Sequence, residues 1–424
     1  MATKRRDWYR LDNAATIYPA ATRLQNTHVF RVAATLDAPI DPAALDLALK
    51  KTLPRFPTFA VMLHRGVFWN YLEANHEPPG VQREERWPCS MMEPGENRGY
   101  CFRVLYFERR IALETYHVLA DGTGAIAFLK SLIYHYLSAF HDDIAYDETV
   151  LNAHIPMVSE ELEDAFHRYA DDGEKKGERV QHEAYHIGGL LLDSERLQVI
   201  HASAPLSVVL AAAKAQDATL TELLSAAFAA SIAQAYHPKA TGLPLRVQIP
   251  VNLRRFFPSR TLRNFSSYID AEVAPDADFP TALATIRSEL REGLQRDAML
   301  ARFSPNVEAQ RNFFMRAAPL PLKTMVLKQA FHRYGERQMT ASISNLGPIV
   351  LPPSMAAHVE SFDFILPSSA WHPVNLAVCS YGDTLFLAFS RVIEETEIER
   401  LCCRMLAGMG IPLCVWNNGE EVLP

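Results

Sequence analysis

Two short motifs in this sequence bring together side chains that could do chemistry. The first has the pattern HxxxDG, with His117 four residues before Asp121 and five before Gly122. A histidine side chain, with an ordinary pKa near ~6.5, can accept a proton from a hydroxyl or an amine as that group attacks an acyl carbon. The motif therefore predicts general base catalysis by His117, with Gly122 allowing a tight turn.

The second motif has the pattern HExxH and places Glu183 directly after His182 and three residues before His186. In a helix, this spacing would put both imidazoles on one face, where they could bind zinc while the glutamate acts as a general base. However, residues 187–189 read Ile-Gly-Gly, where the helix of a zinc protease should continue. Solvated histidines are favoured over a metal site, and a zinc hydrolase remains the alternative from a different enzyme class.

The sequence around His117 predicts a strand, a turn and a helix. Residues 101–107 and 110–117 form two segments with strand periodicity, so His117 ends the second of two strands. From Gly122 onward, apolar residues recur at helical spacing. A purely structural interpretation stays open here, in which a core histidine ends the strand and Asp121 only caps the helix.

The rest of the chain predicts alternating helices and strands in two α/β domains. Helical spacing and capping residues indicate helices at 42–53, 206–215, 220–236, 280–297, 321–334 and 396–409. Short apolar runs indicate strands at 59–63, 67–72, 244–251, 340–344, 359–366, 375–380 and 384–389. Two capping boxes support these bounds, Thr219 with Glu222 and Thr396 with Glu399. A mixed-charge stretch predicts a linker over 171–185 between domains of residues 1–170 and 186–424.

The overall composition excludes several classes of protein. The 424 residues are 49% hydrophobic and 21% charged, which is typical of a globular chain with a sizeable core. The net charge of −7 leaves no basic excess for binding nucleic acid. No signal-peptide pattern and no long apolar run occurs, so we expect a cytoplasmic protein without a stable membrane anchor. The six cysteines form no CxxC pair and are expected to be reduced thiols.

Several segments, in order along the chain, resemble the chloramphenicol acetyltransferase-like superfamily. This superfamily includes alcohol acetyltransferases, plant BAHD acyltransferases, mycobacterial polyketide-associated acyltransferases and condensation domains of peptide synthetases. The HxxxDG turn and its helix resemble the active-site turn of the superfamily. The other similar segments are LDLALKKTLPRFP at 45–57, QIPVNLRR at 248–255 and SNLG at 344–347. The segment LDNAATIYP at 11–19 resembles bacterial alcohol acetyltransferase-like proteins in particular.

The resemblance implies a fold and a reaction. It implies two similar chloramphenicol acetyltransferase-like domains, each a mixed sheet flanked by helices, with a tunnel at their interface. His117 would be the general base, while Asp121 would pair with Arg254 and brace the turn together with Gly122. Ser344 and Asn345 would line the tunnel or the region of the oxyanion, as two adjacent polar side chains. The implied co-substrate is acyl-CoA, with no bound cofactor and no covalent acyl-enzyme, because the acceptor attacks the thioester directly.

The sequence also departs from two subgroups of the superfamily. The DFGWG motif of the plant enzymes is absent, and the nearest segment, SFDFILP at 361–367, shares only the Asp-Phe pair. Condensation domains usually carry a second histidine where this chain has Tyr116. The expected partners are therefore acyl-CoA and a small, hydrophobic hydroxyl or amine acceptor. The alternatives are an acyl group carried by an acyl carrier protein, and a non-catalytic binding protein.

Overall fold

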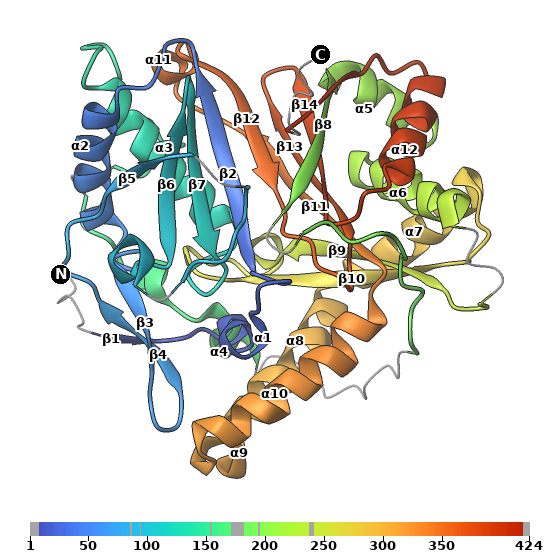
Figure 1. Cartoon of the computed structure of the whole chain (residues 1–424), viewed down its shortest axis with the longest axis horizontal. Helices are drawn as coiled ribbons and strands as arrows, with labels where there is room; N and C mark the ends of the chain where they lie inside the picture. The colour runs from blue at the N-terminus through green and yellow to red at the C-terminus, as the bar shows by residue number, and fades with distance from the viewer. Residues whose placement is uncertain are drawn as a thin grey trace.

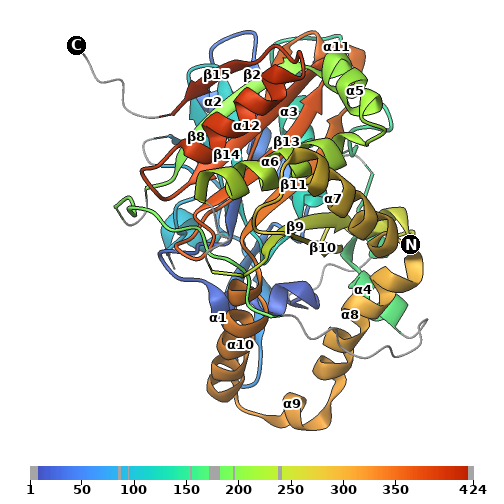
Figure 2. The same cartoon turned by 90° about the vertical axis from the view of Figure 1, so that its right-hand side faces the viewer.

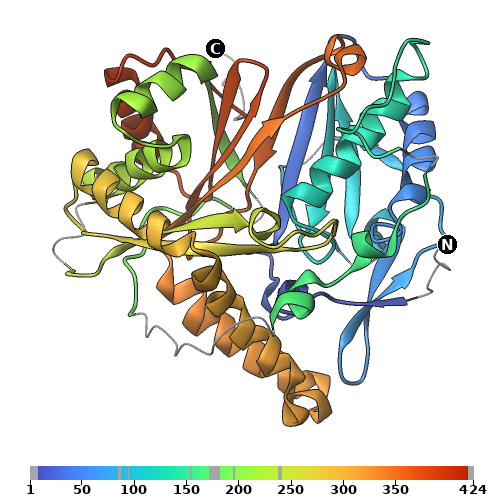
Figure 3. The ribbon, with the colours of Figure 1, turned by 180° about the vertical axis from the view of Figure 1, so that it is seen from behind.

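Two mixed β-sheets, each flanked by helices, make up most of the protein (Figures 1 and 3). The computed structural model describes residues 8–418 except 85–86, 94, 153–154, 171–181, 194–195 and 237–240. The strands of this part of the chain are β1 Trp8–Arg10, β2 Val29–Leu36, β3 Val61–Arg65, β4 Asn70–Ala74, β5 Val81–Arg83, β6 Phe102–Phe107, β7 Arg110–Tyr116, β8 Gln198–Pro205, β9 Leu245–Asn252, β10 Ser266–Val273, β11 Ala341–Ile349, β12 Val359–Ile365, β13 Val374–Tyr381, β14 Thr384–Arg391 and β15 Cys414–Asn417. The α-helices are α1 Tyr18–Ala21, α2 Pro42–Thr52, α3 Gly122–Leu137, α4 Ala165–Tyr169, α5 Leu206–Ala215, α6 Leu220–Tyr236, α7 Phe279–Gly293, α8 Arg296–Arg311, α9 Phe313–Ala317, α10 Leu320–Tyr334, α11 Pro353–Ala356 and α12 Glu397–Gly408.

The first sheet carries the strand that leads to His117. Its strand order is β12-β2-β7-β6-β5, and all neighbours are antiparallel except β5 and β6. Helices α2 and α3 pack against each other, and α3 contacts β2 and β7. Asp41 accepts hydrogen bonds from the backbone nitrogens of Ala43 and Ala44, which caps α2 as its sequence predicts. The predicted strand pair and the helices on either side of it are therefore confirmed.

Charged side chains are buried between three strands of this sheet. Glu114 on β7 is fully buried and accepts hydrogen bonds from Arg31 on β2 and from Arg103 on β6. The two guanidinium groups hold the pKa of Glu114 below its usual range against the opposing effect of burial. One face of these strands is apolar and the other carries this ion-paired cluster. Because a shift by one residue would exchange the two faces, the register of the strands is fixed.

The second sheet is larger and has the strand order β10-β9-β11-β13-β14-β8-β15. Helices α6, α7 and α12 pack together at this sheet, and α6 is buried along most of its length. The predicted capping box of α6 is confirmed, since Glu222 Oε2 accepts from Thr219 N at 2.8 Å and Thr219 Oγ1 accepts from Glu222 N at 3.2 Å. Together the two sheets confirm the predicted α/β class, with mixed sheets flanked by helices.

The second predicted capping box is wrong. Thr396 precedes α12, but its side chain makes no capping hydrogen bond. Glu399 instead points into the core, and burial raises its pKa to about 7. A glutamate three residues after a threonine thus forms no box here, because the helix turns that position towards its packed face.

One strand from late in the chain lies in the first sheet. Strand β12 pairs antiparallel with β2, with Phe364 opposite Val32. The predicted division assigns this strand to the domain of residues 186–424, whereas its hydrogen bonds join it to the sheet of residues 1–170. The predicted linker at 171–185 lies largely outside the described residues, and 182–185 have no regular secondary structure.

A small sheet and a helical arm complete the structure. Strands β1, β4 and β3 form the third sheet, in which β3 and β4 are the hairpin predicted from residues 59–72. Helices α8, α9 and α10 form an arm that projects from the rest of the protein (Figures 1 and 2). Among the described residues, no helix combines the length and apolar composition needed to span a bilayer.

Candidate active site

The HxxxDG motif lies on the turn between β7 and α3, as its sequence predicts. Asp121 accepts hydrogen bonds from the backbone nitrogens of Thr123 and Gly124 and so caps α3. Gly122 does not adopt a positive φ, so backbone freedom is not the reason for glycine here. A Cβ at this position would overlap Leu346, whose side chain packs directly on the turn. Gly122 therefore allows Leu346 of β11 to approach the turn between β7 and α3.

The imidazole of His117 has a defined tautomer. Its Nδ1 lies 2.8 Å from Asn264 Oδ1, while Asn264 Nδ2 donates to His117 O and to Asp12 Oδ2, each at 3.0 Å. Because Nδ2 faces two acceptors, it must be the amide nitrogen, and Oδ1 must accept a proton from Nδ1 of the imidazole. The hydrogen of neutral His117 is thereby fixed on Nδ1, which leaves a lone pair on Nε2.

The surroundings of His117 keep its side chain neutral. Tyr18 stacks on the imidazole with a ring-centroid distance of 4.7 Å, and Phe30 packs at 5.1 Å. Burial lowers the pKa of His117, which outweighs the opposing effect of the Asp121 carboxylate. The residue is only half-buried, so its side chain is not sealed off from solvent. A neutral, oriented and accessible imidazole can act as a general base.

Asp121 and Arg254 lie together, as the resemblance implies. Arg254 Nη1 donates to Asp121 Oδ2 at 2.7 Å, and both side chains are largely buried. The guanidinium also donates to the backbone oxygens of Thr261 and Arg263. The pair therefore joins the start of α3 to the segment between β9 and β10, which reaches across from the second sheet (Figure 3).

Ser344 and Asn345 lie in the middle of β11, and the side chain of Asn345 bonds within its own strand and to helix α6. Asn345 Oδ1 accepts from Gly347 N at 2.8 Å, and Asn345 Nδ2 donates to Thr221 Oγ1 at 3.2 Å. The neighbouring side chain, Leu346, is the one that reaches the catalytic turn. The role of Ser344 and Asn345 in lining a tunnel or an oxyanion site stays a prediction.

Sequence analysis missed two polar residues of this site. Asp12 is fully buried, accepts from Ala15 N at 2.8 Å and orients Asn264, which in turn orients His117. Burial raises the pKa of Asp12 to about 6. No spacing rule connects the three residues, because Asn264 is 252 positions from Asp12 and 147 from His117 in the chain.

We expect the Asn264→Ala variant to reduce kcat by about tenfold to a hundredfold, because a loosened imidazole spends less time in the productive orientation. The amide hydrogen bond also raises the pKa of His117, so the acidic limb of the pH profile should move to lower pH in the variant. Steady-state kinetics across the pH range measure both effects. A drop in kcat with an unmoved limb would point to general disruption of the fold.

The HExxH motif does not have the geometry that zinc binding requires. Residues 182–186 form no helix, so the two imidazoles do not share a helical face. Glu183 pairs instead with Arg337, with Nη2 to Oε2 at 2.6 Å, and His186 packs edge-on against Trp371. Within the described residues, no group of three or more His, Cys, Asp or Glu side chains is placed to hold a metal ion. The non-helical backbone of residues 182–186 therefore contradicts the alternative of a zinc-binding helix, which the sequence already disfavoured.

A hollow of about 590 Å³ opens between segments of both parts of the chain. Its walls combine apolar side chains, such as Leu24, Leu192 and Val392, with polar and charged ones, such as Thr27, Asp193 and Arg196. Thr27 is the residue before His28, whose backbone oxygen accepts a hydrogen bond from the backbone nitrogen of His117. The hollow thus borders the strand ends that position the imidazole.

Comparison with known proteins finds similarity in structure rather than in sequence. No protein-family model matches the sequence, and no curated protein matches it either. Trichothecene 15-O-acetyltransferase from Fusarium sporotrichioides is similar with a TM-score of 0.61 at 12% identity, covering 96% of each chain. Polyketide synthase associated protein 5 from Mycobacterium tuberculosis has a TM-score of 0.57 at 15% identity, covering 94% of this chain and 97% of that one. A mutant starter condensation domain of rhizomide synthetase, in complex with C8-CoA, has a TM-score of 0.58 at 13% identity, covering 95% and 94%.

Proposed function

We propose that this protein, which has the two-domain chloramphenicol acetyltransferase-like fold, transfers an acyl group from a thioester to a hydroxyl or amine acceptor. The observation that carries the proposal is the orientation of His117. Its Nδ1 hydrogen is held by Asn264, so the lone pair of Nε2 is available to an incoming acceptor. General base catalysis by a positioned imidazole is the chemistry that this arrangement supports.

The proposed reaction needs no covalent enzyme intermediate. As the acceptor oxygen or nitrogen bonds to the thioester carbon, its proton passes to Nε2 of His117. The resulting tetrahedral oxyanion then collapses, the carbon–sulfur bond breaks, and the leaving thiolate takes the proton from Nε2. Asp121 and Arg254 contribute by holding the turn rigid, since they form an ion pair with each other and hydrogen bonds with backbone groups.

We propose acyl-CoA as the donor and a hydrophobic hydroxyl or amine compound as the acceptor. A condensation domain of the same fold binds C8-CoA, which supports a CoA thioester as donor. The hollow beside residues 24–27 has largely apolar walls, which supports a hydrophobic substrate. An acyl group on a carrier protein would enter the same reaction and is the alternative donor.

Release of free thiol tests the proposal. Acetyl-, butyryl- and octanoyl-CoA are each incubated with purified protein and a panel of hydrophobic alcohols and amines, with and without a metal chelator. We expect thiol release that requires an acceptor and that the chelator leaves unchanged. Release that needs no acceptor would indicate a hydrolase. No thiol release from any of the CoA thioesters, together with release from an acyl group on a carrier protein, would identify the alternative donor.

The pH profile should reflect a base with a lowered pKa. Below its pKa, His117 is protonated and cannot accept a proton, so kcat/KM should fall only below pH ~6.5, the ordinary value for histidine. Asp12, whose pKa burial raises to about 6, titrates in the same range. The Asp12→Asn variant separates the two groups, because it removes this carboxyl and keeps an acceptor for Asn264. A limb above pH 7 in the wild type would contradict the assignment.

A further inference from the structure

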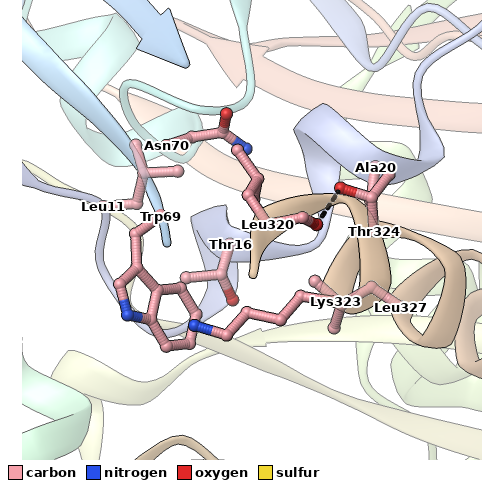
Figure 4. A pocket seen from close by; sticks show the side chains of 9 residues that line it. All are labelled: Leu11, Thr16, Ala20, Trp69, Asn70, Leu320, Lys323, Thr324 and Leu327. Carbon is pink, nitrogen blue, oxygen red and sulfur yellow. Dashed lines mark hydrogen bonds between the residues drawn. The ribbon is translucent and has the colours of Figure 1, made fainter. Parts of the chain in front are cut away.

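The helical arm and the β3–β4 hairpin meet in one projecting end. Leu320 N donates to Val67 O at 2.8 Å, so the start of α10 is bonded to the turn of the hairpin. Lys323 is buried and its Nζ donates to Phe68 O and Arg316 O, while lying 3.5 Å from the ring centre of Trp69 (Figure 4). These contacts hold the hairpin and the arm as a unit. The small pocket shown in Figure 4 lies at their junction.

The end of this unit exposes large apolar side chains. We call them the arm tip, which consists of Val67, Phe68, Phe313, Leu322, Met325 and Val326. Phe313 is 75% exposed and Val67 is 73% exposed, the two highest values for a large hydrophobic residue in the described chain. Isolated exposed apolar residues are normal, but six gathered from a hairpin and an arm indicate a binding surface.

The arm carries an excess of positive charge along its length. Between Glu308 and Glu336 the chain has five Lys and Arg residues and no Asp or Glu. Lys323 is buried, and the other four, Arg311, Arg316, Lys328 and Arg333, are exposed. The whole chain has a net charge of −7, so this positive segment is a local exception. Its partner is therefore expected to be both apolar and anionic.

We propose that the arm tip binds the surface of an anionic lipid bilayer. Apolar side chains that project from a convex end, flanked by Lys and Arg, suit shallow insertion below lipid headgroups. A second copy of this chain is disfavoured as the partner, because its own arm would bring like charges together. An acidic protein would also match the charge, and failure of the protein to bind anionic vesicles would point to that partner instead.

Helix α10 joins the arm tip to the candidate active site. The ring of Phe331, near the end of α10, lies 5.4 Å from that of His28, and Tyr18 packs between His28 and His117. The 15 residues of α10 span about 22 Å. Bound to a bilayer, the protein would hold its active site close to lipid-dissolved substrates. This consequence depends on the proposed acyl transfer, whereas the binding itself does not.

Sedimentation with lipid vesicles tests the proposal on the full chain without any acyl donor. Vesicles of phosphatidylcholine alone are compared with vesicles that also contain phosphatidylglycerol. We expect binding to the anionic vesicles that weakens at high salt. The double variant Phe313→Asp with Met325→Asp should bind anionic vesicles at least about tenfold more weakly than the wild type. We expect a loss of the same size for the double variant Arg316→Glu with Lys328→Glu. All four replaced side chains, those of Phe313, Met325, Arg316 and Lys328, are exposed, so folding should be retained, which thermal melting checks.

Matched controls come from exposed residues far from the arm. Leu47 is 59% exposed on α2, and Leu47→Asp should leave vesicle binding unchanged. Lys51→Glu with Lys214→Glu makes the same change in net charge elsewhere. The proposal is overturned if the wild type does not bind anionic vesicles, or if the arm-tip variants bind these vesicles as strongly as the wild type does. It is also overturned if light scattering shows a dimer that Phe313→Asp with Met325→Asp dissociates, because a second copy then covers the surface.

Discussion

Replacing His117 by alanine should lower kcat/KM for acyl transfer by about 10² to 10⁴-fold, the usual contribution of a positioned general base. The variant keeps the Tyr18 and Phe30 rings that pack around the imidazole, and it keeps the Asp121 cap of α3. Its loss of activity should therefore exceed any loss of stability. Thiol release under saturating acceptor, together with thermal melting, measures the two effects separately.

His28 provides the matched control for this experiment. Its imidazole packs against Tyr18 at a centroid distance of 5.2 Å, close to His117, and burial lowers its pKa to about 3. The His28→Ala variant removes a neighbouring ring without removing the proposed base. We expect its kcat/KM to fall far less than that of His117→Ala. Equal losses in the two variants would show that ring packing, rather than proton transfer, explains the effect.

Replacing Arg254 by alanine should reduce the free energy of unfolding by about 3 to 5 kcal/mol, because Asp121 is left buried without its partner. The backbone oxygens of Thr261 and Arg263 lose a donor in the same step. Urea denaturation of the purified variant measures the change. Arg254→Lys should give an intermediate loss, since an ammonium restores the charge but not the planar set of donors.

The ion pair of Arg337 with Glu183 is the control for the pair of Arg254 with Asp121. Both side chains of the control pair are about half exposed, although its atoms are as close as those of the buried pair. Arg337→Ala should reduce the free energy of unfolding far less than Arg254→Ala does, because water screens the exposed pair. Similar losses for Arg254→Ala and Arg337→Ala would mean that the buried pair does not brace the catalytic turn.

Much of the fold around His117 could be predicted because it depends on local patterns. Three signals depend only on residues that are close together in the sequence: the strand periodicity of β6 and β7, the Asp121 cap and the helical spacing of α3. Strand β2 was not predicted, although its residues are almost all buried. Its Arg31 reads as a surface residue, and only the fold shows that Glu114 neutralises it. Helix α8 was also not predicted. It contains Pro305, and a proline inside a helix is a signal that normally argues against one.

The polar contacts of the site could be predicted from the sequence only in part. Arg254 was named through a resemblance, and it does lie against Asp121. Asn264 and Asp12, which orient the imidazole, come from two loops far apart in the chain, one after β1 and one between β9 and β10. The HExxH motif shows that spacing alone is not enough, because this rare and correctly spaced pattern lies on a segment that is not helical. Spacing predicts chemistry only where the expected secondary structure is present.

The position of β12 has a consequence for how the protein is made. During synthesis on the ribosome, β2 emerges early, while the strand that covers its outer edge is among the last elements to appear. Until then, the first sheet has an open edge that could pair with another nascent chain. The two sheets are thus interdependent, and a fragment ending before Val359 should aggregate rather than accumulate as a stable domain.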